Sequence, residues 1–189
     1  MMWSGSKTGT VGSQVGEGPI SPKSHPLFVA LGTNLGDRLG NLRFAFGRLR
    51  EAGIRLETLS SVFETPPVGY EDQPPFLNMV ASGFADLPPG RVLSIFQRVE
   101  REAGRTPGFR NAPRPLDLDL LFFHDRIVRE EGLRVPHPRW RERSFVVLPL
   151  LEVAPELRDP ETGWQVHEIA DRWPLEPEAI RIVFGPNCF

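Results

Sequence analysis

The chain has 189 residues, of which 40% are hydrophobic and 24% charged, and its formal net charge is −2. That length suits one globular domain, and the charge argues against a protein that holds nucleic acid on a basic surface. No apolar run approaches the roughly 18 residues that a membrane helix needs, and no signal peptide is recognisable. A single cysteine, Cys188, cannot form an internal disulfide, so we expect a cytoplasmic protein.

Residues 1–24 are rich in glycine, serine, threonine and lysine and poor in apolar residues. Such a segment cannot bury enough apolar surface to offset the entropy lost on ordering. We therefore expect a disordered tail over 1–24 and a single domain over residues 25–189.

The domain should begin with a buried strand at Pro26–Leu31, followed by a turn at 32–37 and a helix whose apolar residues recur from Leu39 to Leu49. The glycines of the turn could cradle a phosphate, but they lack the lysine of a P-loop and the third glycine of a dinucleotide fingerprint. A tight turn in which Asn34 or Asp37 caps the helix is the favoured reading.

A second strand is predicted over Ile54–Phe63, and four prolines in the next twelve residues, 64–75, then exclude regular structure. Loops of this length in compact domains often have a function. A strand resumes at Phe76–Ala81, where Asn78 stands among apolar residues and must find hydrogen-bond partners. This amide either anchors the loop or contacts a polar ligand, and both readings remain open.

Apolar spacing predicts a helix from Pro88 to Ala103, and Leu116–Phe123 reads as a strand buried on both faces. The remaining expected elements are a turn at 124–126, a short return strand at 127–128, an extended segment at 133–138, a helix at 145–153 bent by Pro149, and a short closing helix within 164–175. This order suits an α+β, ferredoxin-like sandwich: an antiparallel sheet with helices on one face, plus a C-terminal extension. The right-handed crossover preference puts the two strand-bridging helices on the same face and leaves the other face open for ligands.

Asp117 and Asp119 are two residues apart on a predicted strand, so both should point to one face. Leu121 and Phe123 continue that face, which indicates a strand entering a cleft. Like-charged carboxylates there would repel each other, and a cation would relieve the repulsion. Oxygen ligands favour Mg²⁺ or Mn²⁺ over zinc. The alternative is that both are surface residues of an amphipathic strand.

Three arginines, Arg105, Arg110 and Arg114, precede the acid pair. They could neutralise a polyphosphate that the same metal holds, or they could belong to an ordinary solvated loop. His137 stands between two prolines, where a structural role is the commoner case.

Several motifs then occur in a characteristic order. They are Leu31-Gly-Thr-Asn-Leu-Gly-Asp37, Thr65-Pro-Pro-Val-Gly69, Phe76-Leu-Asn78, Pro113-Arg-Pro-Leu-Asp-Leu-Asp119, Val135-Pro-His-Pro138 and Arg143-Ser-Phe-Val-Val-Leu-Pro-Leu150. Together they make residues 27–158 resemble the 6-hydroxymethyl-7,8-dihydropterin pyrophosphokinases of folate biosynthesis.

The resemblance implies that pyrophosphate passes from ATP to the hydroxymethyl oxygen of the pterin, which gives the pterin pyrophosphate and AMP. It implies two Mg²⁺ ions on Asp117 and Asp119, with Arg105 and Arg114 completing the catalytic set. The implied pterin contacts are Thr65, Pro66, Val68, Phe76, Asn78 and Phe145, the two phenylalanines enclosing the ring. The implied ATP contacts are Gln97, Glu100, Arg105, Arg110, Arg114, His137 and Arg143. We expect a monomer that binds ATP and the pterin and neither nucleic acid nor membrane.

One motif departs from the family pattern. Members typically have Arg-Trp-Gly-Pro-Arg-Thr before the acid pair, whereas this chain has Arg110-Asn-Ala-Pro-Arg-Pro115. The tryptophan and glycine are absent, and Pro115 cannot donate a backbone hydrogen bond. Flexibility of this loop and affinity for ATP are the properties that the departure affects.

Two other functions stay open on the residues alone. A ferredoxin-like sheet can stack RNA bases on aromatic side chains, although the acid pair and the net charge of −2 argue against that. A Mg²⁺-dependent phosphohydrolase or nucleotidyltransferase would use a similar acid pair but release different products.

Overall fold

The structure is a computed structural model that describes residues 24–109, 111–172 and 180–189. The tail expected over 1–24 lies outside the described residues except for Ser24, and Arg110 lies outside them as well.

A six-stranded antiparallel sheet forms the centre of the molecule, with the strand order β5-β1-β4-β3-β8 and with β2 also paired to β4. The strands are β1 (His25–Thr33), β2 (Ile54–Leu59), β3 (Val62–Thr65), β4 (Phe76–Ala85), β5 (Asp117–Phe123) and β8 (Arg181–Phe184). The long strand β4 pairs with β1 along one edge and with β2 and then β3 along the other. A separate ribbon joins β6 (Val128–Glu130) to β7 (Leu133–Val135).

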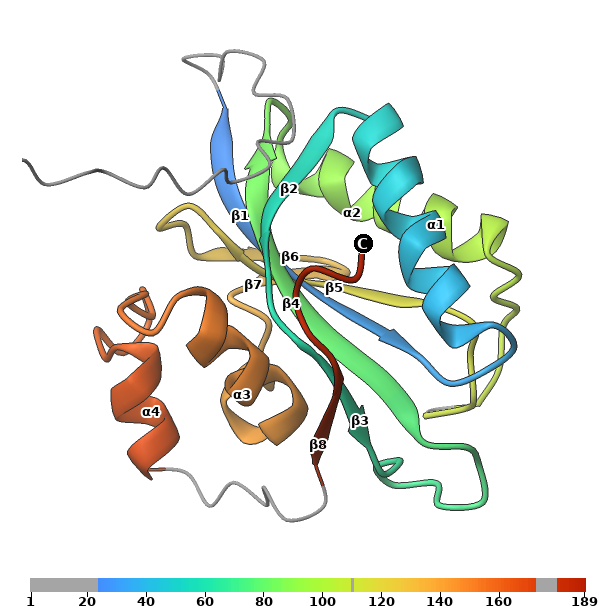
Figure 1. Cartoon of the computed structure of the whole chain (residues 1–189). Coiled ribbons are helices and arrows are strands. Elements are labelled where there is room, and N and C mark those ends of the chain that lie inside the picture. Colours follow the sequence, from blue (N-terminus) through green and yellow to red (C-terminus); the bar gives the residue numbers. More distant parts are fainter. Residues whose placement is uncertain (1–23, 110, 173–179) are drawn as a thin grey trace, which may run out of the picture.

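Helices cover both faces of this sheet (Figure 1). The two crossover helices, α1 (Arg38–Glu51) and α2 (Pro89–Glu102), lie together on one face, as the sequence predicted. The C-terminal extension adds α3 (Ser144–Val153) and α4 (Val166–Arg172), which pack on the other face. That face was expected to be open, but α3 and α4 cover part of it.

Two clusters of buried side chains follow from this layering. In the first, Val92, Phe96 and Val99 of α2 and Leu42 of α1 pack on the sheet, so the predicted apolar stripe of α2 is confirmed. The second joins the sheet to α3, α4 and the 3-10 turn η1 (Trp140–Glu142), with Trp140 fully buried. Asp37 caps α1 by accepting a hydrogen bond of 2.9 Å from the backbone N–H of Gly40, which supports the capping interpretation.

Three expectations about the strands need correction. β1 continues to Thr33, so Gly32 belongs to a strand and not to a turn. The strand expected over Ile54–Phe63 is divided between β2 and β3 at Ser60 and Ser61. The division is stabilised locally, because the Ser60 hydroxyl accepts from Val80 N (3.0 Å) and Ser61 N donates to Glu152 (2.7 Å). The short return strand expected over Ile127–Val128 begins at Val128, ends at Glu130 and pairs with β7.

A β-bulge in β5 corrects a fourth expectation. Val29 pairs with Leu120 and Phe28 with Phe122, so Leu121 is an extra residue in β5. Leu121 and Phe122 therefore both pack in the second cluster, while Phe123 packs in the first. The prediction that Phe123 shares the face of the aspartates was wrong, because alternation of sides ends at the bulge.

The helices of the C-terminal segments were predicted, whereas their strand was not. α3 lies where a helix containing Pro149 was expected, and α4 lies within the expected closing helix. Trp173 and Leu175, which contributed to that expectation, lie outside the described residues. Strand β8 was not predicted; it pairs with β3 at one edge of the sheet.

Candidate functional site

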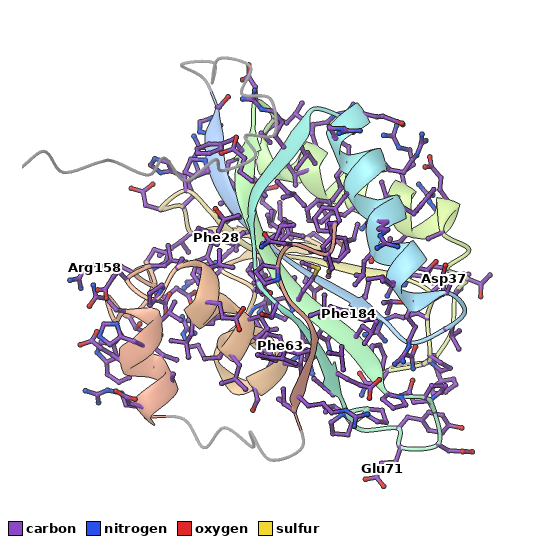
Figure 2. The ribbon with its side chains drawn as sticks, viewed as in Figure 1. Phe28, Asp37, Phe63, Glu71, Arg158 and Phe184 are labelled. Atoms are coloured by element: carbon purple, nitrogen blue, oxygen red, sulfur yellow. The ribbon has the colours of Figure 1, made fainter. Side chains whose placement is uncertain are left out.

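A cavity of about 370 Å³ opens beside the second cluster of the core. It lies between the proline loop (residues 66–75), the floor of the sheet, the arginine loop (described residues 104–109 and 111–116) and the segment that leads into α3. Glu71 marks the outer tip of the proline loop (Figure 2). The cavity brings together all six side chains assigned to the pterin by resemblance: Thr65, Pro66, Val68, Phe76, Asn78 and Phe145.

The floor of this cavity is a row of residues across three strands. Gly32 of β1 pairs with Asn78 of β4 on one side and with Asp117 of β5 on the other. A Cβ atom on Gly32 would lie 2.9 Å from Asn78 Oδ1 and 3.7 Å from Asp117 Cβ. Any larger residue would place side-chain atoms against the Asn78 amide and beside Asp117, so glycine keeps this part of the floor open. Sequence reasoning missed this role because it placed Gly32 in a turn.

Asn78 is buried, and its Nδ2 donates a hydrogen bond of 2.7 Å to Thr65 Oγ1, at the point where β3 enters the proline loop. The amide therefore anchors the loop. Its Oδ1 has no hydrogen-bond partner among the residues that the structure describes. One side chain can thus fulfil both of the roles that the sequence left open.

Asp117 and Asp119 point to the face of the sheet that carries α3, because Leu118 and Leu120 beside them pack in the first cluster. Asp117 pairs with Arg105 and with Arg114, each at 2.7 Å. The sequence argument expected repulsion between bare carboxylates, but arginines of this chain already neutralise that charge.

Asp119 has partners of its own on the segment that leads into α3. Arg143 Nη1 donates to its Oδ2 at 2.9 Å, and His137 Nε2 lies 3.8 Å from the same oxygen. Burial lowers the pKa of His137, although the charge of Asp119 acts in the opposite direction. His137 also has a structural role, because its backbone N–H donates to Leu121 O at 3.0 Å.

Glu100 lies beneath Arg105, with 10% of its side chain exposed. Its Oε1 accepts a hydrogen bond of 2.8 Å from Leu118 N on the free edge of β5, and it forms an ion pair with Arg105. Burial raises the pKa of Glu100 to about 7, although Leu118 N and Arg105 both favour the charged form. A carboxyl held in this way supports Arg105 and does not face the cavity.

Both aromatic walls of the cavity carry a guanidinium group. Arg114 lies 5.2 Å from the ring centroid of Phe76, and Arg143 lies 5.5 Å from that of Phe145. Each of these arginines also holds one aspartate of the acid pair. The charged half and the aromatic half of the site are therefore joined through the same two side chains.

Asn34 links the loops around the site, although the sequence suggested only a capping role for it. Its Nδ2 donates to Gln73 Oε1 (2.9 Å) and to Pro74 O (3.0 Å) in the proline loop. Its Oδ1 accepts from Arg114 N at 2.8 Å, and its own N–H donates to Arg114 O at 3.1 Å. Asn34 is 2% exposed, and nothing in the local sequence pattern indicates these long-range contacts.

The departure from the family pattern also lies at this junction. Asn111 has a positive φ of 62°, and its carbonyl accepts from Gln73 Nε2 at 3.1 Å. Nearby, the exposed rings of Tyr70 and Phe109 meet edge to face at 5.1 Å. The two loops therefore contact each other without a tryptophan in this motif.

A second cavity of about 340 Å³ adjoins Asp119 and His137. Leu93, Leu120 and Leu133 give it apolar walls, and Arg134 adds a positive charge at its edge. Of the side chains assigned to ATP, three line neither cavity: Gln97, which is exposed on α2, Glu100 and Arg105. Arg110 lies outside the described residues.

Within the described ranges, no group of three or more His, Cys, Asp or Glu side chains forms a metal site. None of the described helices is long and apolar enough to span a bilayer.

Comparison with known proteins bears on the family of the chain. The family model of 7,8-dihydro-6-hydroxymethylpterin-pyrophosphokinase (HPPK) matches residues 28–155. A Bacillus subtilis 2-amino-4-hydroxy-6-hydroxymethyldihydropteridine pyrophosphokinase is 43% identical over 72% of this chain and 82% of its own length. A mitochondrial folate synthesis bifunctional protein of Arabidopsis thaliana is 38% identical over 80% of this chain. The chain spans only 27% of that plant relative and 29% of a similar one from Pisum sativum.

Among solved structures, a triple-mutant Plasmodium falciparum HPPK-DHPS with pteroate superposes with a TM-score of 0.68 at 14% identity, over 84% of this chain and 46% of that one. This likeness supports the fold. The sequence matches, together with the motifs around the cavity, support the conclusion that the chain belongs to the 7,8-dihydro-6-hydroxymethylpterin-pyrophosphokinase family.

Proposed function

We propose that this chain transfers pyrophosphate from ATP to the hydroxymethyl oxygen of 6-hydroxymethyl-7,8-dihydropterin, giving the pterin pyrophosphate and AMP for folate biosynthesis. The observation that carries the proposal is the single cavity in which two aromatic walls and a buried amide adjoin an aspartate–arginine cluster. That combination suits a flat heteroaromatic acceptor beside a polyphosphate donor.

The pterin fits the aromatic half of the cavity. Its ring would lie between Phe76 and Phe145, where flat π-systems stack favourably. The Oδ1 of Asn78, which has no partner among the described residues, can accept a hydrogen bond from an amino or ring N–H group of the pterin, while Thr65 holds the amide in place. Pro66 and Val68 close the side of the proline loop.

The nucleotide fits the remaining half. The second cavity, which has both leucine walls and polar side chains, is suited to the adenosine, and the triphosphate would then cross Asp119 and His137 toward Asp117. Arg105, Arg114 and Arg143 lie along that path and can exchange a carboxylate partner for phosphate oxygens.

Two Mg²⁺ ions suit the acid pair. Asp117 and Asp119 offer oxygen ligands on one face at the junction of the cavities, and Mg²⁺ commonly takes one or two carboxylates together with phosphate oxygens and water. When bound, such ions would neutralise charge on the triphosphate. The residues present therefore fit the ions that the family resemblance implies.

The reaction needs positioning and charge neutralisation more than a strong base. The pterin oxygen would bond to the β-phosphorus, and the bond from that phosphorus to the α,β-bridging oxygen would break, so that AMP leaves. Glu100 keeps Arg105 directed at the reacting groups through its ion pair. We further propose a cytoplasmic monomer whose partners are ATP and the pterin.

Product analysis tests the proposal. Purified chain incubated with Mg²⁺, ATP and the hydroxymethyl pterin should release AMP in an amount equal to the pterin pyrophosphate formed, and no AMP without the pterin. Release of ADP, or of free phosphate or pyrophosphate without a pterin product, would instead indicate a different phosphotransferase or a hydrolase.

A further inference from the structure

One arginine in the segment that lines the site points away from it. His137, Arg139, Arg143 and Phe145 each line one of the two cavities. Arg141 lies between them in the sequence and lines neither. Its guanidinium pairs with Asp159 and Glu161, in the connection between α3 and α4.

The partner segment is a tight hairpin at residues 158–165, in which Arg158 pairs with Gln165. Asp159 is fully buried at its centre. The Asp159 Oδ1 accepts from Glu161 N (3.0 Å) and its Oδ2 accepts from Thr162 Oγ1 (2.8 Å). The carboxylate is therefore fixed by its own hairpin as well as by Arg141.

The contacts of Arg141 are specific in direction. Its Nε donates to Asp159 Oδ2 at 2.6 Å and its Nη2 to Glu161 Oε2 at 2.8 Å, with 15% of the side chain exposed. Two donors of one planar guanidinium thus contact two carboxylates, which restricts the orientation of the backbone that carries them. A pair at this depth differs from an exposed ion pair, which contributes little.

The backbone beside Arg141 leads directly to the site. Trp140 packs on Phe122 at 5.0 Å, and Arg143 N donates to Trp140 O at 3.3 Å. The carbonyl of Arg143 then accepts from Val146 N (2.8 Å) and Val147 N (2.9 Å) at the start of α3. The Trp140 ring and the backbone hydrogen bonds hold the turn on the sheet, and the pairing of Arg141 adds a directed contact from the turn to the connection between α3 and α4.

We infer that Arg141 and Asp159 form a positioning pair, which holds η1 so that Arg143 and Phe145 reach the triphosphate and the pterin. The inference rests on the proposed function and deepens it. Neither residue touches a substrate; each acts through Arg143, whose guanidinium meets Asp119 and the ring of Phe145.

The test is a double-mutant cycle on binding of ATP with Mg²⁺, measured by calorimetry without pterin. We expect Arg141→Ala to weaken binding about tenfold, and Arg143→Ala to weaken it at least as much. The variant carrying both changes should bind no more weakly than Arg143→Ala alone, because Arg141 acts only through Arg143. Losses that multiply in the double variant, or an Arg141→Ala chain that binds normally, would overturn the positioning pair.

Two further variants separate positioning from general stability. Arg158→Ala removes a donor to Gly163 O in the same hairpin but does not touch η1, and Arg158 points away from the sheet (Figure 2). It should bind ATP normally. If Arg141→Ala does not fold, Arg141→Lys retains one charged contact to Asp159. That variant should show cooperative unfolding with weakened binding, and unchanged binding by it would overturn the inference. Failure of the unaltered chain to bind ATP would overturn the proposed function itself.

Discussion

The two faces of the sheet are formed by the same strands but have different roles. On the α1–α2 face, Leu118 and Leu120 of β5 pack against apolar helices. On the α3 face, Asp117 and Asp119 of the same strand are partly exposed and paired with arginines. The first face is covered by packed helices, whereas the second packs on α3 and α4 in one part and gives up close packing for a cavity in another. Changes in the first cluster should affect folding, and changes at the cavity should affect catalysis.

The strongest test of this contrast is the acid pair. We expect Asp117→Ala or Asp119→Ala to abolish detectable AMP formation, a loss of at least about 10³-fold, because phosphate charge would no longer be matched by bound ions. Both variants should unfold cooperatively. Asp125→Ala, an exposed aspartate just past β5, is the matched control and should stay active. Normal Mg²⁺-dependent activity in an acid-pair variant would refute the metal assignment.

The opposite result is expected on the first face. Leu42 of α1 is fully buried, so Leu42→Ala should lower the free energy of unfolding by about 2–5 kcal/mol. Activity per folded molecule should be unchanged at a temperature where the variant remains folded. Urea unfolding followed by circular dichroism, with activity measured on the same samples, checks both parts. A large loss of activity in the folded variant would show that the two faces are coupled.

Gly32 of β1 allows a test of the floor of the cavity. A methyl group there would lie 2.9 Å from Asn78 Oδ1, so Gly32→Ala should weaken pterin binding about tenfold by displacing the amide. The control is Gly47→Ala in α1, where a Cβ meets nothing within 4 Å. That change should leave binding unaltered and raise helix stability by up to about 1 kcal/mol. Fluorescence titration with the pterin distinguishes the two variants.

Glu100 is a buried carboxyl in α2, whose other buried residues are apolar. Its raised pKa predicts that the stability of the chain depends on pH. Burial raises its pKa from the ordinary value of 4.5 to about 7, so the folded chain keeps this proton where the unfolded chain has lost it. The stability from this group is complete below about pH 4.5 and falls as the pH rises toward about 7. Glu100→Gln should remove that part of the decline. Urea midpoints measured between pH 5 and pH 7.5 for both proteins test it, and parallel curves would contradict the prediction.

Regular features could be predicted because they depend on residue period alone. The spacing of Val92, Phe96 and Val99 indicated α2, and the alternation of Asp117 with its neighbours indicated a shared face. The bulge at Leu121 could not be predicted in this way, because it depends on pairing with β1. Strand β8 depends on β3 in the same manner.

The site likewise has some features that the sequence predicted and others that it did not. Its acid pair and aromatic walls follow from motifs that are short in sequence. The contacts of Asn34 reach from β1 to the proline loop and to Arg114, across 39 and 80 residues of chain. The position of Gly32 against Asn78 likewise depends on strand register. Such contacts between distant segments leave no local signal, so they had to await the structure.

Arg105, Arg114 and Arg143 act as internal counter-ions for the acid pair. A cleft that carries its own counter-ions remains electrically balanced when no nucleotide is present, and its shape does not depend on a dissolved cation. Treatment with a chelator should therefore stop AMP formation while leaving the melting temperature unchanged. A cation would have to replace these guanidinium groups, so we expect Mg²⁺ to bind together with a polyphosphate, whose oxygens can accept the released arginines.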